Sequence, residues 1–187
     1  TIGSYAAPEF HLCVAAASEM ADYYGLPFYG TAACSDARVL DEQSVSEATF
    51  QLFSTMLGKA NLVHDLGIME HAKGTSPEMV VLADEIIEGL KHYTQGIEVN
   101  NEELALELLA KVPPGGNYLL EDHTHNNFKR IWYPKLFTRE MQPEDSSQVR
   151  PRIKKRIRDI QHGHQVPELD QDVLNELQEW EKLLHKR

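Results

Sequence analysis

Residues 24–43 read YGLPFYGTAACSDARVLDEQ, and this stretch decides the expected fold. Gly25 ends a helical pattern, and the short apolar run from Leu26 to Tyr29 predicts a β-strand. A polar segment follows this run and leads into the next helical pattern. A strand that ends in a polar loop before a helix is typical of α/β barrels, whose active sites lie in such loops.

The same order of elements recurs along the chain. Apolar residues at helical spacing predict a first helix from Pro8 to Tyr24, because proline is favoured at the first helical position. A second helical stripe runs through residues 45–56, and a second short strand is expected within residues 60–67. Ser76 and Pro77 then predict the start of a third helix.

The next segment extends this alternation. Asn100 and Glu103 have the spacing of a capping box, which predicts a helix that continues to Val112. A last short strand is expected at residues 117–120. Helices that alternate with short buried strands predict an α/β fold with parallel strands.

The chain divides into two parts by composition. Residues 1–140 carry the α/β alternation, whereas residues 141–187 are expected to form a polar, proline-containing linker over 141–148 and two terminal helices. The first helical pattern begins almost at once after Thr1. The N-terminus could therefore be a cut inside a larger domain.

Composition excludes several classes of function. The formal net charge of −11 argues against a generic nucleic-acid or anionic-membrane binder, which needs concentrated Lys and Arg. The sequence has neither a secretory signal nor an apolar run long enough to span a bilayer. With only two cysteines, we expect a soluble protein in the reducing cytoplasm.

Polar side chains gather where the predicted strands end. In a barrel these side chains would converge on one face. The first group is Phe28, Tyr29, Cys34, Ser35 and Asp36; the second is His64, Asp65 and Glu70; the third is Glu121, Asp122, His123 and His125. Each also has a structural interpretation: Asp36 or Asp41 could cap a helix, and His64 could be a buried histidine with satisfied hydrogen bonds.

Two alternative chemistries use the same residues. His123 and His125 with His64 and Cys34 could ligate zinc, although their spacing matches no zinc motif. Cys34 is also a formal nucleophile for a hydrolase, but a small residue that packs under the loop is the simpler interpretation. Cys13 lies on the expected apolar stripe of the first helix and is predicted to be a core thiol.

A basic segment lies near the C-terminus. Arg150, Arg152, Lys154, Lys155, Arg156 and Arg158 alternate with apolar residues on one expected helix. Such a segment is usually a solvated helix face, and its functional alternative is a docking surface for an acidic partner protein.

Several motifs resemble one known family. They are APEF (7–10), YYGLP (23–27), CSDARVLDEQ (34–43), GKANLVHDLG (58–67), GIEV (96–99) and PGG (114–116). In the residues, order and spacing of these motifs, the chain resembles the trimethylamine:corrinoid methyltransferase family from about Ser4 to Phe137. The terminal helices resemble the family's C-terminal tail more loosely.

The resemblance implies a fold and an activity. This chain resembles the C-terminal part of a (β/α)8 barrel with a terminal helical extension. Family members transfer a methyl group from a tertiary or quaternary amine to the Co(I) of a separate corrinoid protein, and they bind no corrinoid tightly themselves. The sequence shows no pyrrolysine, so it resembles the pyrrolysine-free branch, which includes glycine betaine methyltransferases.

The resemblance and the strand-end positions together give the expected substrate pocket. A quaternary ammonium is already an activated methyl donor, so the site needs to hold the cation in an aromatic and anionic pocket and to aim one methyl group at the cobalt. The expected pocket residues are Phe28, Tyr29, Asp36, His64, Glu70 and His123.

Two other functions stay open from the sequence. The chain could be a truncated, non-catalytic fragment or an interaction module of such an enzyme, or it could be a metal-dependent barrel hydrolase. An open part of a barrel would expose strand edges and apolar faces, so homo-oligomers are also expected.

Overall fold

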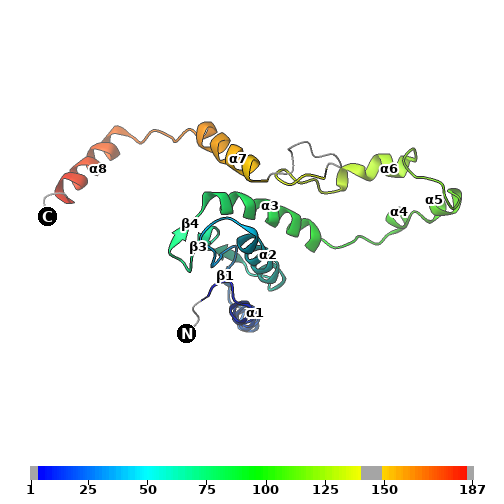
Figure 1. Cartoon of the computed structure of the whole chain (residues 1–187), viewed down its shortest axis with the longest axis horizontal. Helices are drawn as coiled ribbons and strands as arrows, with labels where there is room; N and C mark the ends of the chain where they lie inside the picture. Colours follow the sequence, from blue (N-terminus) through cyan, green and yellow to red (C-terminus); the bar gives the residue numbers. More distant parts are fainter. Residues whose placement is uncertain (1–3, 140–148, 185–187) are drawn as a thin grey trace.

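The computed structural model describes residues 4–139 and 149–184, which form a helix-rich structure with a few short strands (Figure 1). The elements, in order, are α1 (Pro8–Tyr23), β1 (Tyr29–Thr31), α2 (Glu42–Leu57), β2 (Leu62–His64), β3 (Ile68–Met69), β4 (Gly74–Thr75), α3 (Pro77–Thr94), α4 (Asn101–Leu104), α5 (Leu106–Lys111), α6 (Asp122–Asn127), the 3-10 helix η1 (Phe128–Arg130), α7 (Val149–Gly163) and α8 (Gln171–Leu184).

Strands β1 and β2 pair in parallel and are joined through α2, as the alternation predicted. Tyr29 lies opposite Leu62, and Thr31 lies opposite His64. The second strand was predicted correctly, but the first begins at Tyr29 and not at Leu26. Within β1, a Cβ at Gly30 would lie 2.9 Å from the Cβ of Ala60, so glycine lets the strand pack this closely.

Helix α1 occupies the predicted residues but buries a different face. His11 and Ser18 are its buried residues, whereas Cys13 is exposed. The prediction of a core thiol at Cys13 was therefore wrong for this chain. The reason is tertiary: the Ser18 hydroxyl donates to the Gly58 carbonyl at the end of α2, and the His11 ring packs edge-on against Phe50.

Helix α3 forms as predicted and supplies much of the core. The Ser76 hydroxyl accepts a hydrogen bond from the Met79 N–H, and Pro77 lies in the first turn. Its apolar stripe packs between α2 and α7. The buried cluster includes Leu40, Ala48, Leu52, Met79, Leu82, Ala83, Ile86, Leu136 and Ile153.

A β-hairpin that the sequence analysis did not predict lies between β2 and α3. Strands β3 and β4 pair antiparallel, with Met69 opposite Gly74. Glu70, His71 and Ala72 in its loop all have positive φ angles, of 51°, 54° and 67°. Three consecutive non-glycine residues in the left-handed conformation store backbone strain, and the contacts around the loop hold them in this conformation.

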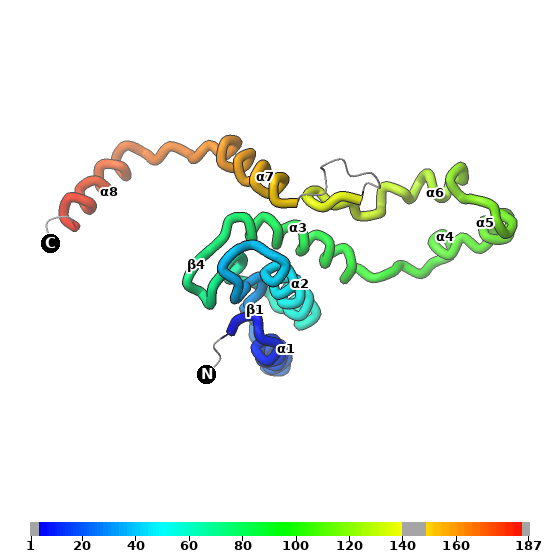
Figure 2. The backbone as a smooth tube through the Cα atoms, in the orientation of Figure 1, coloured from blue at the N-terminus to red at the C-terminus, as the bar shows by residue number. Residues whose placement is uncertain are grey.

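After α3 the chain leaves the core and forms an arm, residues 95–133, which Figure 2 shows extending away from α2 and α3. The predicted capping contact is present, because the Asn100 side chain accepts from the Glu103 N–H. The single helix predicted to continue to Val112 is instead two short helices, which break at Ala105 with a φ of 45°. The strand predicted at 117–120 was wrong, since residues 117–118 have no regular structure and Leu119 and Leu120 lie in a turn.

The arm returns to the core through one buried carboxylate. Glu85 Oε1 on α3 accepts hydrogen bonds from the backbone N–H groups of Lys135, Leu136 and Phe137, at 2.8, 2.9 and 3.3 Å. Helix α7 then packs on α3 through Ile153. Both terminal helices were predicted correctly, whereas the predicted linker at 141–148 lies outside the described residues, and the domain boundary at residue 140 stays a prediction.

The chain exposes far more surface than a compact protein of its mass. Its accessible surface is 14717 Å², whereas a folded monomer of 21.2 kDa exposes about 9,100 Å². Exposed apolar side chains of the arm, of α8 and of the open face of the β1–β2 sheet contribute to this excess. Among the described helices, none combines the length and the apolar character that a membrane span requires.

Candidate functional site

Four side chains come together where Tyr29 and Thr31 of β1 lie beside His64 and Asp65 at the carboxyl end of β2. The Tyr29 and His64 rings lie 4.3 Å apart between centroids. His64 Nε2 lies 3.2 Å from the Thr31 hydroxyl, and His64 Nδ1 lies 2.8 Å from a carboxylate oxygen of Asp65. Because a carboxylate only accepts hydrogen bonds, Nδ1 carries a proton, and in the neutral ring Nε2 accepts from Thr31.

This group lies on the face of the sheet away from α2. Successive residues of a strand point to opposite faces, and Gly30 faces Thr55 of α2. Tyr29 therefore points to the other face, where it is 59% exposed. An aromatic ring beside an imidazole and a carboxylate can hold an organic cation through cation–π and ionic attraction.

Two polar residues of α2 hold the loop after β1. Glu47 Oε2 accepts from the Ser35 hydroxyl at 2.6 Å and from the Asp36 N–H at 3.0 Å. Gln51, which is fully buried, accepts from the Cys34 N–H at 2.8 Å. Sequence reasoning missed both residues, and the available signal was their four-residue spacing on the inner face of α2.

The same loop meets the strained hairpin. Asp36 Oδ1 lies 3.0 Å from His71 Nδ1, and the Ser4 hydroxyl donates to the other Asp36 oxygen. Glu70 forms an ion pair with Arg38 at 3.0 Å. Asp36 and Glu70 therefore lie in neighbouring loops beyond the strand ends, as predicted, but both carboxylates already have partners, and His71 was not a predicted site residue.

Cys34 packs under this loop and is a poor nucleophile. Its side chain is fully buried, and its Sγ lies 3.4 Å from the Asp65 carbonyl oxygen. Burial, together with the negative charges of Asp65 and Asp36, raises the pKa of the Cys34 thiol to about 12. A thiol that is protonated at neutral pH favours the packing interpretation over the hydrolase interpretation.

The structure does not bring Phe28 or His123 into this group. Phe28 lies before β1, at its amino end, where it lines a cavity of about 590 Å³ together with Ser18 and Asn61. His123 lies on α6 in the arm, where its Nε2 is 3.1 Å from the Glu102 carbonyl oxygen.

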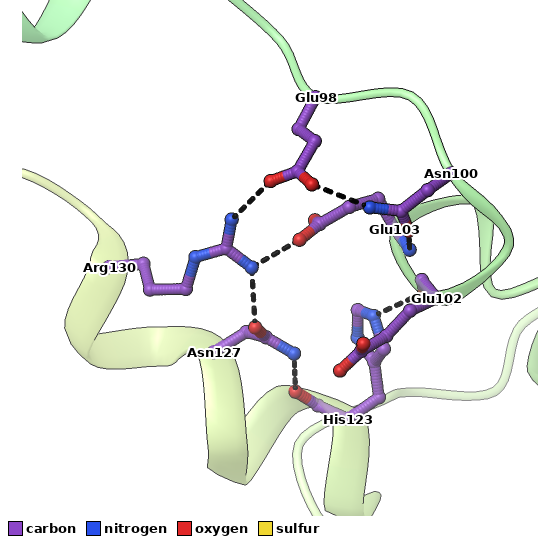
Figure 3. Close-up of polar contacts among 7 residues, drawn as sticks. All are labelled: Glu98, Asn100, Glu102, Glu103, His123, Asn127 and Arg130. Carbon is purple, nitrogen blue, oxygen red and sulfur yellow. Dashed lines mark hydrogen bonds and ion pairs between the residues drawn. The ribbon is translucent and has the colours of Figure 1, made fainter. Parts of the chain in front are cut away.

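His123 belongs to a polar cluster that joins the two legs of the arm (Figure 3). Arg130 forms an ion pair with Glu103, and its Nη2 lies 3.9 Å from Glu98 Oε2. Its Nη1 donates a hydrogen bond to the Asn127 side-chain oxygen at 2.8 Å. In this structure His123 therefore has polar contacts within the arm and lies away from Tyr29 and His64.

The zinc hypothesis gains no support from the geometry. Within residues 4–139 and 149–184, no three His, Cys, Asp or Glu side chains gather as a metal site would require. The proposed ligands are separated instead: His64 and Cys34 lie in the core, whereas His123 and His125 lie on α6 of the arm.

Comparison with known proteins agrees with the motifs. A model of the trimethylamine methyltransferase family matches residues 3–184. The chain is 33% identical over 175 residues to trimethylamine methyltransferase MttB2 of Methanosarcina mazei, covering 91% of this chain and 35% of that protein. It is 29% identical over 180 residues to glycine betaine methyltransferase of Desulfitobacterium hafniense, covering 94% of this chain and 38% of that protein.

The chain thus spans little more than a third of the length of these curated relatives. The match nevertheless covers nearly all of its own residues, including both strands and the loops after them. This chain belongs to the trimethylamine methyltransferase family.

Proposed function

We propose that this chain forms the C-terminal part of a methyltransferase that moves a methyl group from a tertiary or quaternary methylated amine to the Co(I) of a partner corrinoid protein. The observation that carries the proposal is the contact between Tyr29 and His64, with centroids 4.3 Å apart, on the open face of two parallel strands. The family supplies the reaction class, and the site supplies an aromatic and anionic surface for a cation.

The proposed roles follow from the side-chain chemistry. The Tyr29 ring attracts the ammonium through its π face, since a quaternary nitrogen has no N–H to donate. Asp65 orients the His64 imidazole and adds negative charge next to it. Together these residues position the cation so that one methyl group points away from the sheet, which is catalysis by positioning.

The corrinoid supplies the Co(I) nucleophile that accepts the methyl group, and in this proposal a partner protein carries it. The role proposed for this chain is to bind the amine.

The proposed setting of the site is a (β/α)8 barrel. In such a barrel the helices lie outside and the strand-end loops form the active face. The β1–α2–β2 unit supports this arrangement, because its strands are parallel and α2 covers one sheet face only. The opposite face, with Tyr29, Leu62 and His64, would then point to the barrel interior.

The experiment is methyl transfer from trimethylamine, dimethylamine and glycine betaine to a reduced corrinoid protein, followed by the absorbance change of the cobalt. It uses the 187-residue chain and, in parallel, any longer protein that contains it. Substitution Tyr29→Leu is expected to raise KM for a quaternary amine about tenfold, in line with a cation–π contribution of about 1–2 kcal/mol. Tyr29→Phe, which keeps the π face, serves as the matched control.

Equal KM values for the leucine and phenylalanine variants would remove Tyr29 from the proposed site. No transfer by the longer protein with any amine would refute the proposed reaction.

A second candidate function rests on a different observation. Tyr29 and Leu62 leave the sheet face exposed, and the arm carries further exposed apolar residues such as Leu120. Such surfaces mark interaction sites. If only the longer protein is active, then the 187-residue chain by itself is the non-catalytic fragment or interaction module.

A further inference from the structure

Helix α8 carries an apolar stripe that no described residue covers. Val173, Leu177, Trp180 and Leu184 follow one another at alternating spacings of four and three residues, which places them on one side of the helix. All four are exposed, Trp180 by 60%, and α8 has no buried residue. A helix of this length is marginal in water unless such a face packs against a partner.

A groove of matching character lies between α3 and α7. It has a volume of about 740 Å³ and is lined by Val80, Val81, Leu136 and Ile160 among other residues. Ile160 is 46% exposed, so the apolar floor is open to solvent. The charged residues that line the groove are of both signs: Lys135, Arg152, Lys155 and Arg156 are basic, and Asp84, Glu85 and Asp159 are acidic. Lys155 and Arg156 form its basic rim on α7.

The charges of the two elements are opposite. The acidic residues of α8 are Asp172, Glu176, Glu179 and Glu181, against the single base Lys182. On α7, Arg150 and Arg152 donate to the carbonyls of Leu40 and Leu136, and Lys154 lies 3.9 Å from Glu78. Lys155 and Arg156 have no ion pair among the described residues, which leaves the basic rim available to an acidic helix.

We propose that α8 of one chain docks into the α3–α7 groove of a second copy of the same chain, and that the exchange is reciprocal. The apolar stripe would cover Val80, Val81 and Ile160, and the acidic flank would face Lys155 and Arg156. The lengths agree, because helices of 14 and 15 residues are about 21 and 22 Å long.

The path of the chain points to a second copy rather than to the same chain. Figure 1 shows α8 lying away from α3, after a connection without regular structure over residues 164–170. Pro167 in this connection favours an extended conformation at Val166. An element that projects from its own core and complements a groove on that core is the geometry of a reciprocal exchange between copies.

The test is a charge-reversal pair studied by sedimentation velocity over a range of concentrations. The first variant reverses α8 with Glu176→Lys, Glu179→Lys and Glu181→Lys, and the second reverses the groove with Lys155→Glu and Arg156→Glu. The matched control reverses an exposed charge of the arm, with Glu107→Lys. Circular dichroism checks that each variant keeps its helical content.

The unmodified chain and the control variant should form dimers that weaken as salt is raised. Each reversed variant alone should associate at least about tenfold more weakly, because like charges then face each other. An equimolar mixture of the two should restore the dimer, since both contacts in the mixed pair join opposite charges.

Three results would overturn the proposal. One is a monomer at all concentrations, and another is a dimer that neither reversal weakens. The third is loss of association in both variants without recovery on mixing. If a variant fails to fold, the salt dependence of dimer formation by the unmodified chain still tests the proposal. None of these measurements depends on methyl transfer, so they test the dimer separately from the proposed function.

Discussion

Glu85 is the residue that ties the return of the arm to the core. It is 4% exposed, and its Oε1 accepts three backbone hydrogen bonds. Glu85→Ala should lower the free energy of unfolding by roughly 2–4 kcal/mol, because it leaves N–H donors without an acceptor inside the protein. Urea titration measures the loss.

Glu85→Gln is the control for this change. It keeps a carbonyl oxygen of the same reach and loses only the charge, so its effect should be clearly smaller. If alanine and glutamine are equally tolerated, the three hydrogen bonds do not hold residues 135–137.

His11 makes stability depend on pH. Its ring is buried between α1 and α2 and contacts Phe50 at 5.3 Å. Burial lowers the pKa of His11 below 6.5, and a hydrogen bond with the Ala6 backbone opposes this only in part. Below pH 6.5 the unfolded chain therefore binds more protons than the folded one.

The stabilisation from a neutral His11 should thus be complete above about pH 7 and should fall as the pH drops through 6.5 toward the lowered pKa. Thermal unfolding between pH 5 and 8 measures this slope. His11→Phe should flatten it, and an unchanged slope in that variant would assign the pH dependence to other groups.

The two cysteines should differ in reactivity. Cys13 is exposed, whereas Cys34 is buried and has a pKa of about 12. A thiol reagent at pH 8 should therefore label Cys13 quickly and Cys34 only after denaturant is added. Cys13→Ser should abolish the fast phase, and a fast phase that persists in this variant would show that Cys34 is accessible.

At the scale of elements, α2 begins with a reciprocal cap. The Asp41 carboxylate accepts from the Ser44 N–H at 2.9 Å, and the Ser44 hydroxyl accepts from the Asp41 N–H at 2.8 Å. Asp41→Ala should cost about 1 kcal/mol of stability in urea titration, while Asp41→Asn should cost only a few tenths. Equal losses for both variants would indicate that charge, and not the cap, is what matters at this position.

At the scale of the whole molecule, the exposed surface predicts an extended shape. A compact chain of this length has a radius of gyration of about 16 Å. Because the arm and α8 project from the core (Figure 1), small-angle X-ray scattering of the monomer fraction should give a clearly larger value. A value near that of a compact chain would mean that these segments fold back on the core in solution.

Local interactions made much of the helical structure predictable. Ser76 with Pro77, and Asn100 with Glu103, mark helix starts because their contacts lie within one turn. The strand ending at His64 was likewise predictable from its apolar run and the polar residues after it. The position of His64 at the end of β2 could be predicted for the same reason, whereas Tyr29 begins β1 and meets the His64 ring only in the folded structure.

What the sequence by itself determined is therefore the order of the main helices and of the two parallel strands, their caps, and the position of His64 at the end of a strand. Only the tertiary structure decided that Cys13 is exposed, that residues 68–75 form a hairpin, and that His123 lies in the arm. It also revealed the roles of Glu47 and Glu85, whose hydrogen-bond partners lie 11 to 52 residues away. The physical reason is range: caps and helical periodicity act within a few residues, whereas buried faces and polar partners depend on segments that meet only when the chain folds.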